Sequence, residues 1–269
     1  MNAQVAEILR ARGVDPQSFV EGRSGVWTGD ILTADALSIW GSLREVFGET
    51  NVWPVLRGDA AELEEPPDEL LELSQVSSIP AGTAREILSE RFQSECDACA
   101  EMIADWSPPE SFEAAAAQVD RAGIYSFSGT PSTPVEWKDP VNDKPLQLQT
   151  LVSIGSLGKF VSLSLVPAEH PWDAVVVLAF GGWNECPEPA IIAGVLREWN
   201  KRFGAVPACM TNSVLECIVD RPPRSETDCL ALAAEQWILC DDIVGQGTQS
   251  VHKLAAELSA SPHWFFWWD

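Results

Sequence analysis

The sequence predicts an α/β (α+β) fold, in which helices flank a mixed β-sheet and the N-terminal region is more helical and acidic. Three observations lead to this prediction. Hydrophobic residues make up 46% of the 269 residues, which is enough to bury a large core. In the N-terminal half, apolar residues recur at three- and four-residue steps, as they do on helix faces. In the C-terminal half, short β-branched runs alternate with helical segments, as in layered sheet-and-helix domains.

The N-terminal elements follow from periodicity and from breakers. Pro54 lies in a short apolar run and indicates an edge strand, because proline has no N–H for a ladder bond. The prolines at 108 and 109 end a long helical pattern. We expect an acidic N-terminal region over 1–125, with helices over 2–12, 33–48, 83–106 and 111–121, a strand over 52–56 and an acidic loop over 58–68.

The stretch 126–148 is rich in Ser, Thr, Pro and Asp and is expected to be a linker or long loop. Beyond it, the sequence predicts a C-terminal domain over 149–269. The continuous apolar run 174–180 is typical of a buried central strand. The other expected elements are a hairpin over 151–154 and 160–166, helices over 189–203, 225–239 and 248–259, and strands over 205–210, 214–219 and 264–268.

The chain is strongly acidic, with 40 Asp and Glu against 17 Lys and Arg and a net charge of -23. Such a field opposes binding to nucleic acid and to an anionic membrane, and it attracts a basic protein. The simpler interpretation is a solvated surface that aids solubility. Residues 59–113 hold 15 acids and two bases. The candidate partner-binding acids within this stretch are Glu62, Glu64, Glu65, Asp68 and Glu69.

The N-terminal 15 residues lack the basic start and apolar stretch of a secretory signal, so the cytoplasm is the expected location. The seven cysteines are spread irregularly, which does not suggest a disulfide framework. Cys96 and Cys99 fall inside a helical pattern and are expected to be core residues. Cys186, Cys240 and His263 show no metal-ligand spacing, so neither a metal nor a cofactor is expected.

Two C-terminal segments form a specific combined motif. They are Phe180–Pro187, with the sequence FGGWNECP, and His263–Asp269, with the sequence HWFFWWD. Together with Arg221-Pro222-Pro223 and Ile243–Gly247, they resemble the uncharacterised bacterial family called domain of unknown function four-two-five-three. The resemblance covers about residues 160–269. It implies a shared fold and a bacterial cytoplasmic protein, and it implies no reaction.

The glycine pair at 181 and 182 follows the predicted central strand and precedes a helix. Ligands gather at such strand ends in open α/β sheets. The candidate catalytic residues are Glu185 as a base, Cys186 as a nucleophile and His263 as its activating neighbour. The candidate ligand-binding or partner-binding residues are Trp183, Asn184, Glu185, Asp242 and Gln246. In the structural interpretation, Trp183 fills the core, Cys186 is small and buried, and Gln246 belongs to a turn.

Three functions fit these observations. The first is a non-enzymatic protein-interaction module, most concretely an immunity-type or toxin-antagonist protein that binds a basic protein such as a toxin. Its acidity and its 12 tryptophans favour this hypothesis, because aromatic residues are preferred anchors in interfaces. The second is a small-molecule hydrolase or transferase that uses the turn Trp183–Cys186. The third is a regulatory or scaffold domain. A pocket beside that turn would favour the enzyme.

Overall fold

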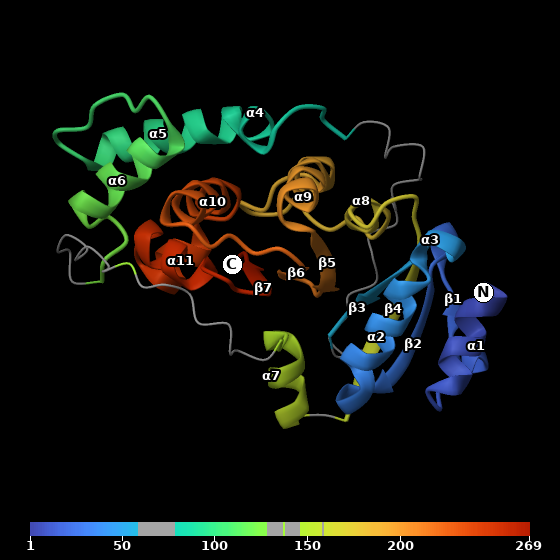
Figure 1. Cartoon of the computed structure of the whole chain (residues 1–269). Helices are drawn as coiled ribbons and strands as arrows, with labels where there is room; N and C mark the ends of the chain where they lie inside the picture. The colour runs from blue at the N-terminus through green and yellow to red at the C-terminus, as the bar shows by residue number, and fades with distance from the viewer. Residues whose placement is uncertain (59–78, 128–136, 138–145, 158) are drawn as a thin grey trace.

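A computed structural model describes residues 1–58, 79–127, 137, 146–157 and 159–269, and seven strands within these ranges form one mixed sheet (Figure 1). Its strand order is β1-β2-β4-β3-β5-β6-β7. The neighbouring strands are antiparallel except for β3 and β5, which are parallel. The strands are β1 (Val20–Glu21), β2 (Trp27–Leu32), β3 (Val52–Leu56), β4 (Phe160–Pro167), β5 (Ala205–Met210), β6 (Val214–Val219) and β7 (His263–Trp267).

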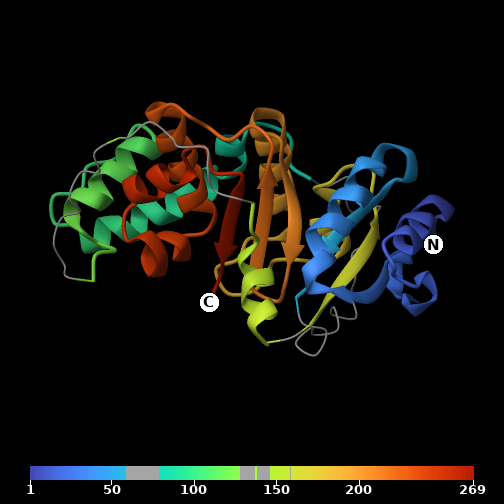
Figure 2. The same cartoon turned by 60° about the horizontal axis from the view of Figure 1, so that its bottom comes forward.

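Helices cover both faces of this sheet, which confirms the α/β prediction. Helices α9 and α10 lie over one face of β5–β7, and α7 lies against the other (Figures 1 and 2). The helices are α1 (Ala3–Ala11), α2 (Ala36–Glu45), α3 (Phe47–Thr50), α4 (Ala84–Ile87), α5 (Ser89–Met102), α6 (Phe112–Ala122), α7 (Gln149–Leu157), α8 (Asp173–Val177), α9 (Pro189–Phe203), α10 (Glu226–Leu239) and α11 (Val251–Leu258). Short 3₁₀ turns η1 (Pro16–Ser18), η2 (Arg23–Gly25) and η3 (Thr33–Asp35) and a π-helix η5 (Ile243–Thr248) complete them.

The sheet crosses the predicted division at residues 126–148. Strand β4 pairs with β2 on one side and with β3 on the other, although more than 100 residues separate β3 from β4. The region before residue 125 therefore contributes three strands as well as helices. Two of them, β1 and β2, have no counterpart among the predicted elements.

The run 174–180 was wrongly predicted as a central strand. Its first residues form helix α8, and Ala174–Val177 are at most 1% exposed. A short apolar run that is buried on every side has no periodicity that distinguishes a strand from a helix. The Gly181 turn therefore follows a buried helix and not the end of a strand.

Two further predictions are wrong. Residues 151–154 belong to α7 and not to a hairpin, because the carboxylate of Glu216 accepts the backbone N–H groups of Gln149 and Thr150 and caps a helix there. Strand β3 is interior and not at an edge. It pairs with β5 only at Leu56, so the β5 side requires no N–H donor at position 54, and proline is tolerated there.

The core around the C-terminus is aromatic. Trp199 of α9 packs edge-on against Trp264 and is stacked with Phe266, with centroid distances of 5.6 Å in both pairs. Trp264, Phe266 and Trp268 are at most 1% exposed. The predicted terminal strand is thus confirmed, but the expectation that it is fully buried is wrong, because only one face of β7 is part of the core.

Candidate functional site

Strand β7 presents different side chains to its two sides. Its residues alternate between buried and partly exposed, as expected for a strand with period two. Trp264 and Phe266 pack against α9, whereas His263, Phe265 and Trp267 remain partly exposed. These three residues and part of Trp264 line a cavity. A single strand therefore supplies both a core face and the wall of a site.

The cavity beside β7, called here the β7 cavity, has a volume of about 860 Å³. Small-molecule sites usually fall between about 300 and 1,000 Å³. The other walls come from the start of α7, from α10, from α11 and from the π-helix η5, an element that is frequent at functional sites. Its polar lining residues include Gln147, Gln149, Gln236, Asp242, Gln246, Glu257 and His263.

Gln236 is the most informative of these residues. It lies on α10, is 1% exposed and lines the cavity, yet its Nε2 atom has no hydrogen-bond partner among the described residues. A buried polar group without a partner costs about 1–3 kcal/mol, so most such groups in native proteins are paired. Gln236 therefore places an amide nitrogen without a recorded partner in the wall of the cavity, where that nitrogen is itself buried.

Asp242 and Gln246 meet in the same wall. The Gln246 side-chain amide donates to Asp242 Oδ1 at 2.9 Å, and the backbone N–H of Asp269 donates to Oδ2 at 3.1 Å. These bonds fix the carboxylate at the entrance to η5 and connect it to the last residue of the chain. The structure thus brings together two of the sequence-predicted ligand residues.

His263 is held by a buried carboxylate. Its Nε2 lies 2.6 Å from Oε2 of Glu216, which is 0% exposed on the neighbouring strand β6. Burial by itself raises the pKa of a carboxyl, but hydrogen bonds from His263 and Thr150 outweigh it and hold the pKa of Glu216 below its ordinary value. Because the same carboxylate caps α7, one charged group fixes both the imidazole and the helix that forms the opposite wall.

The predicted turn has a different environment. The backbone of Gly181 has φ of +119°, and a Cβ there would lie 2.2 Å from the carbonyl oxygen of Pro187, so only glycine fits. Trp183 packs edge-on against Phe180 at 5.0 Å, and the Asn184 side chain donates to the carbonyl of Asp269. The Asn184 bond therefore attaches the turn to the last residue of the chain.

The two candidate catalytic residues of the turn are not arranged for catalysis. Cys186 is 4% exposed, and burial raises the pKa of its thiol to about 12, which keeps it protonated. The Glu185 backbone carbonyl accepts a bond from Arg91, and its side chain is exposed. His263 makes its recorded ring contact with Glu216 and lines the β7 cavity, which none of the residues 181–187 does. Sequence reasoning placed these three residues together, and the structure shows no contact between His263 and Cys186.

Two residues of the site were missed from the sequence. Glu216 is the only charge in the apolar strand 214–219, and Gln236 follows Glu235 in a mainly apolar stretch of α10. A polar residue inside an apolar run is a signal, because such residues are seldom buried unless paired. The acids Glu62, Glu64, Glu65, Asp68 and Glu69 lie outside the described residues.

Within the described ranges, no three His, Cys, Asp or Glu side chains are grouped so that they could bind one metal ion. Over the same part of the chain, no helix is both long and apolar enough to cross a bilayer.

Comparison with known proteins identifies a family for the C-terminal part of the chain. None of the curated proteins and none of the solved structures matches the chain. Residues 162–269 match a family model described as a domain of unknown function (DUF4253). The match begins inside β4, ends at the last residue and contains most of the cavity wall, namely β7, α10, η5 and α11. The C-terminal part of the chain, residues 162–269, is therefore a DUF4253 domain, as its two sequence motifs indicated.

Proposed function

We propose that this chain is a non-enzymatic binding module whose ligand occupies the β7 cavity. The observation that carries the proposal is the buried Gln236 side chain, whose Nε2 atom lacks a partner in the cavity wall. A ligand that completes its hydrogen bonds is one reason why a protein retains such a group at a cost in stability. The aromatic rings of Phe265 and Trp267 supply an apolar surface beside it, as in most ligand sites.

The lining also determines which ligands are favoured. Asp242 and Glu257 contribute carboxylates, and no lysine or arginine is among the described residues that line the cavity. A neutral or positively charged ligand is therefore favoured over an anionic one. We propose that the protein acts in the bacterial cytoplasm. There, such a ligand can be part of a basic protein, and the chain would bind it as an immunity-type or toxin-antagonist protein.

A panel of small probes tests this function. N-methylacetamide, a neutral amide, and methylguanidinium, a cation, are titrated against acetate while the Gln236 side-chain amide is followed by ¹⁵N NMR. We expect the neutral and cationic probes to shift this signal and acetate to leave it unchanged. The Gln236→Met variant should weaken binding of the same probes at least about tenfold, as measured at the Trp267 indole. If no probe moves either signal, the proposal is wrong.

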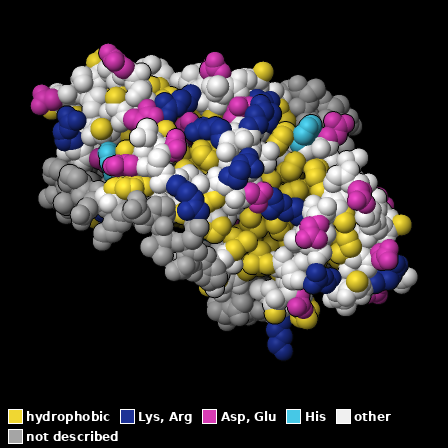
Figure 3. All heavy atoms as spheres, in the orientation of Figure 1, with side chains coloured by type: hydrophobic (Ala, Val, Ile, Leu, Met, Phe, Trp, Pro, Cys, Tyr) yellow, Lys and Arg dark blue, Asp and Glu magenta, His cyan; other side chains and the backbone are white. Residues whose placement is uncertain are grey.

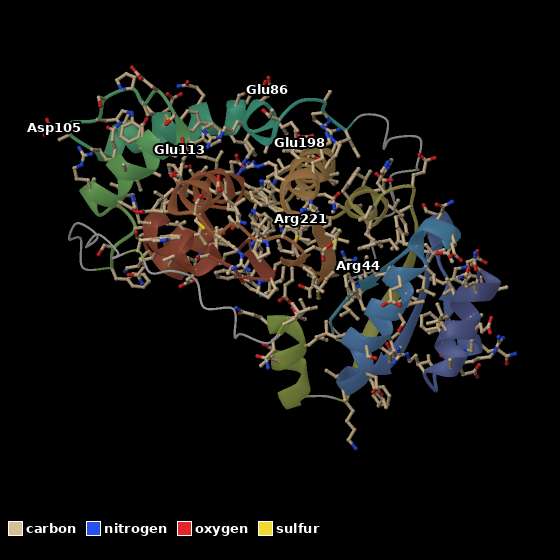
Figure 4. The ribbon with its side chains drawn as sticks, viewed as in Figure 1. Arg44, Glu86, Asp105, Glu113, Glu198 and Arg221 are labelled. Carbon is tan, nitrogen blue, oxygen red and sulfur yellow. The ribbon has the colours of Figure 1, made fainter. Side chains whose placement is uncertain are left out.

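A second surface favours a basic protein partner independently of the cavity. Six exposed carboxylates on or beside α4 and α5 form no ion pair with another described residue. We call this set the α5 acidic surface, and it comprises Glu86, Glu90, Asp97, Glu101, Asp105 and Glu110. Glu86 and Asp105 are labelled in Figure 4 at the outer side of the molecule. Figure 3 shows Lys and Arg side chains among acidic ones on this face, and Arg85 and Arg91 lie on α4 and α5 themselves.

The salt dependence of association tests this second surface. Partner proteins from co-expression with adjacent genes are measured for association rate at low and high salt, since exposed charges more than about 10 Å apart are screened at 0.1 M. Replacing Glu90, Asp97 and Glu101 by their amides should slow association more than it speeds dissociation. The matched control neutralises Glu7 and Glu21, which are exposed near the N-terminus. If the association rate changes neither with salt nor with these substitutions, the acidic surface has no role in binding and serves only solubility.

A further inference from the structure

On the outer edge of β7, the backbone N–H and C=O of Phe265 have no hydrogen-bond partner among the described residues. In an antiparallel pair, positions that exchange ladder bonds alternate with positions that do not. Trp268 donates its backbone N–H to Ser213, and Val219 donates to Pro262. Between these two bonds, Trp264 and Phe266 therefore occupy positions that exchange backbone hydrogen bonds with β6. Phe265, opposite Glu216, occupies a position that does not. The N–H and C=O of Phe265 therefore point away from β6, toward the free edge of the sheet.

This open edge is short. At one end, the Ser261 hydroxyl donates to the carbonyl of His263 and accepts from its N–H. At the other end, the Cys240 thiol donates to the carbonyl of Trp267 at 3.1 Å. Phe265 lies between these closed ends, and its side chain lines the cavity. The edge thus accommodates one residue of an added strand, with no room for a long one.

Three recognition elements therefore meet in one cavity. The Phe265 backbone offers a donor and an acceptor in the spacing of a β-bridge, Gln236 offers a side-chain amide, and the Asp242 carboxylate provides negative charge. Addition of an extended segment to a sheet edge is an established mode of peptide recognition, in which backbone bonds give affinity and neighbouring pockets select side chains. A rigid small molecule would not need the backbone pair.

We propose that the β7 cavity binds a short, extended and positively charged peptide, which exchanges two backbone hydrogen bonds with Phe265 and places its cation beside Asp242. This inference rests on the proposed function, because it names the class of ligand for the same cavity. The peptide can be free or can be the exposed end of a larger protein. A free peptide and an exposed protein end present the same backbone groups and the same cation to the cavity.

Blocked tetrapeptides test the inference. One set carries Lys at a fixed position among otherwise random residues, a second set carries Glu there, and a third repeats the Lys set with an N-methylated backbone. We expect the Lys set to shift the Phe265 backbone amide and the Gln236 side-chain amide in ¹⁵N NMR. The Glu set and the N-methylated set should bind at least about tenfold more weakly. Joining the best Lys sequence to the end of a carrier protein then separates the two sources, since retained affinity identifies an accessible protein terminus as a ligand.

A matched pair of variants isolates the backbone bond. Phe265→Ala removes the ring, and Phe265→Pro removes the ring and the N–H. Proline is tolerated at edge strands when its nitrogen faces away from the ladder. The proline variant should bind the Lys peptide at least about tenfold more weakly than the alanine variant. N-methylation of the peptide gives the same information if the proline variant does not fold.

Two outcomes would overturn the inference, namely equal binding of the Lys and Glu sets or full binding by N-methylated peptides. Its failure is distinguishable from failure of the proposed function. If N-methylacetamide and methylguanidinium bind in a manner that depends on Gln236 while no peptide does, the cavity is a small-molecule site and only the peptide inference fails.

Discussion

Gln236→Met should make the protein more stable while it weakens ligand binding. Methionine has nearly the same length as glutamine and contains no N–H group to leave unsatisfied. Removal of the unpartnered Nε2 in the buried Gln236 side chain therefore recovers its desolvation penalty of about 1–3 kcal/mol. For a chain of this size, each kcal/mol raises the melting temperature by about 2–4 °C. Most core substitutions have the opposite sign, so the expected gain is diagnostic.

Urea unfolding followed by circular dichroism measures this effect. A higher midpoint with an unchanged slope shows a change in stability alone. Gln17→Met is the matched control, because Gln17 is exposed, and its effect should stay within about 0.5 kcal/mol. A loss of more than about 1 kcal/mol in Gln236→Met would show that the amide is satisfied in the folded protein. The physical argument for a ligand at this position would then be refuted.

Three further predictions address the rest of the chain. Deletion of residues 264–269 removes three fully buried aromatic side chains, so the melting temperature should collapse, given that truncating one such side chain costs about 3–5 kcal/mol; an unchanged midpoint would make the segment peripheral. The Asp120 hydrogen bond raises the pKa of His252, so its stabilisation is complete below pH 6.5 and is lost as pH rises through the raised value; urea midpoints should show this decline, and His252→Ala should flatten it. At a net charge of -23, a generic DNA duplex should show no retardation with the protein in a gel shift at physiological salt, and a salt-sensitive complex would contradict this.

Much of the fold could be predicted where local signals agree. The helix 189–203 has an apolar face, a proline at its first position and a left-handed glycine at 204 after its last, and its predicted bounds match α9. Ser225 caps α10 as expected, with its side chain accepting from the Asp228 N–H. In these segments the periodicity, the cap and the terminator all indicate the same structure.

Failures occurred where a distant contact decides the structure. Residues 149–157 begin a helix because Glu216, more than 60 residues away, caps it. The α8 run has no exposed face to reveal its period. The cavity could not be predicted for a similar reason. Gln236 and Phe265 are ordinary residues of a helix and a strand, and only the packing of α10 near β7 brings them to the same cavity.

The placement of β4 bears on how the chain is made. Strands β2 and β3 leave a gap between them that β4 fills, and the last residue of β4 is Pro167. During synthesis, β2 and β3 therefore lack their shared pairing partner until about two thirds of the chain has emerged. Contacts between residues so far apart in sequence form slowly and leave strand edges unpaired meanwhile. Chaperones that shield exposed strand edges should accordingly bind nascent chains in which β4 has not yet emerged from the ribosome, and release those in which residue 167 has emerged.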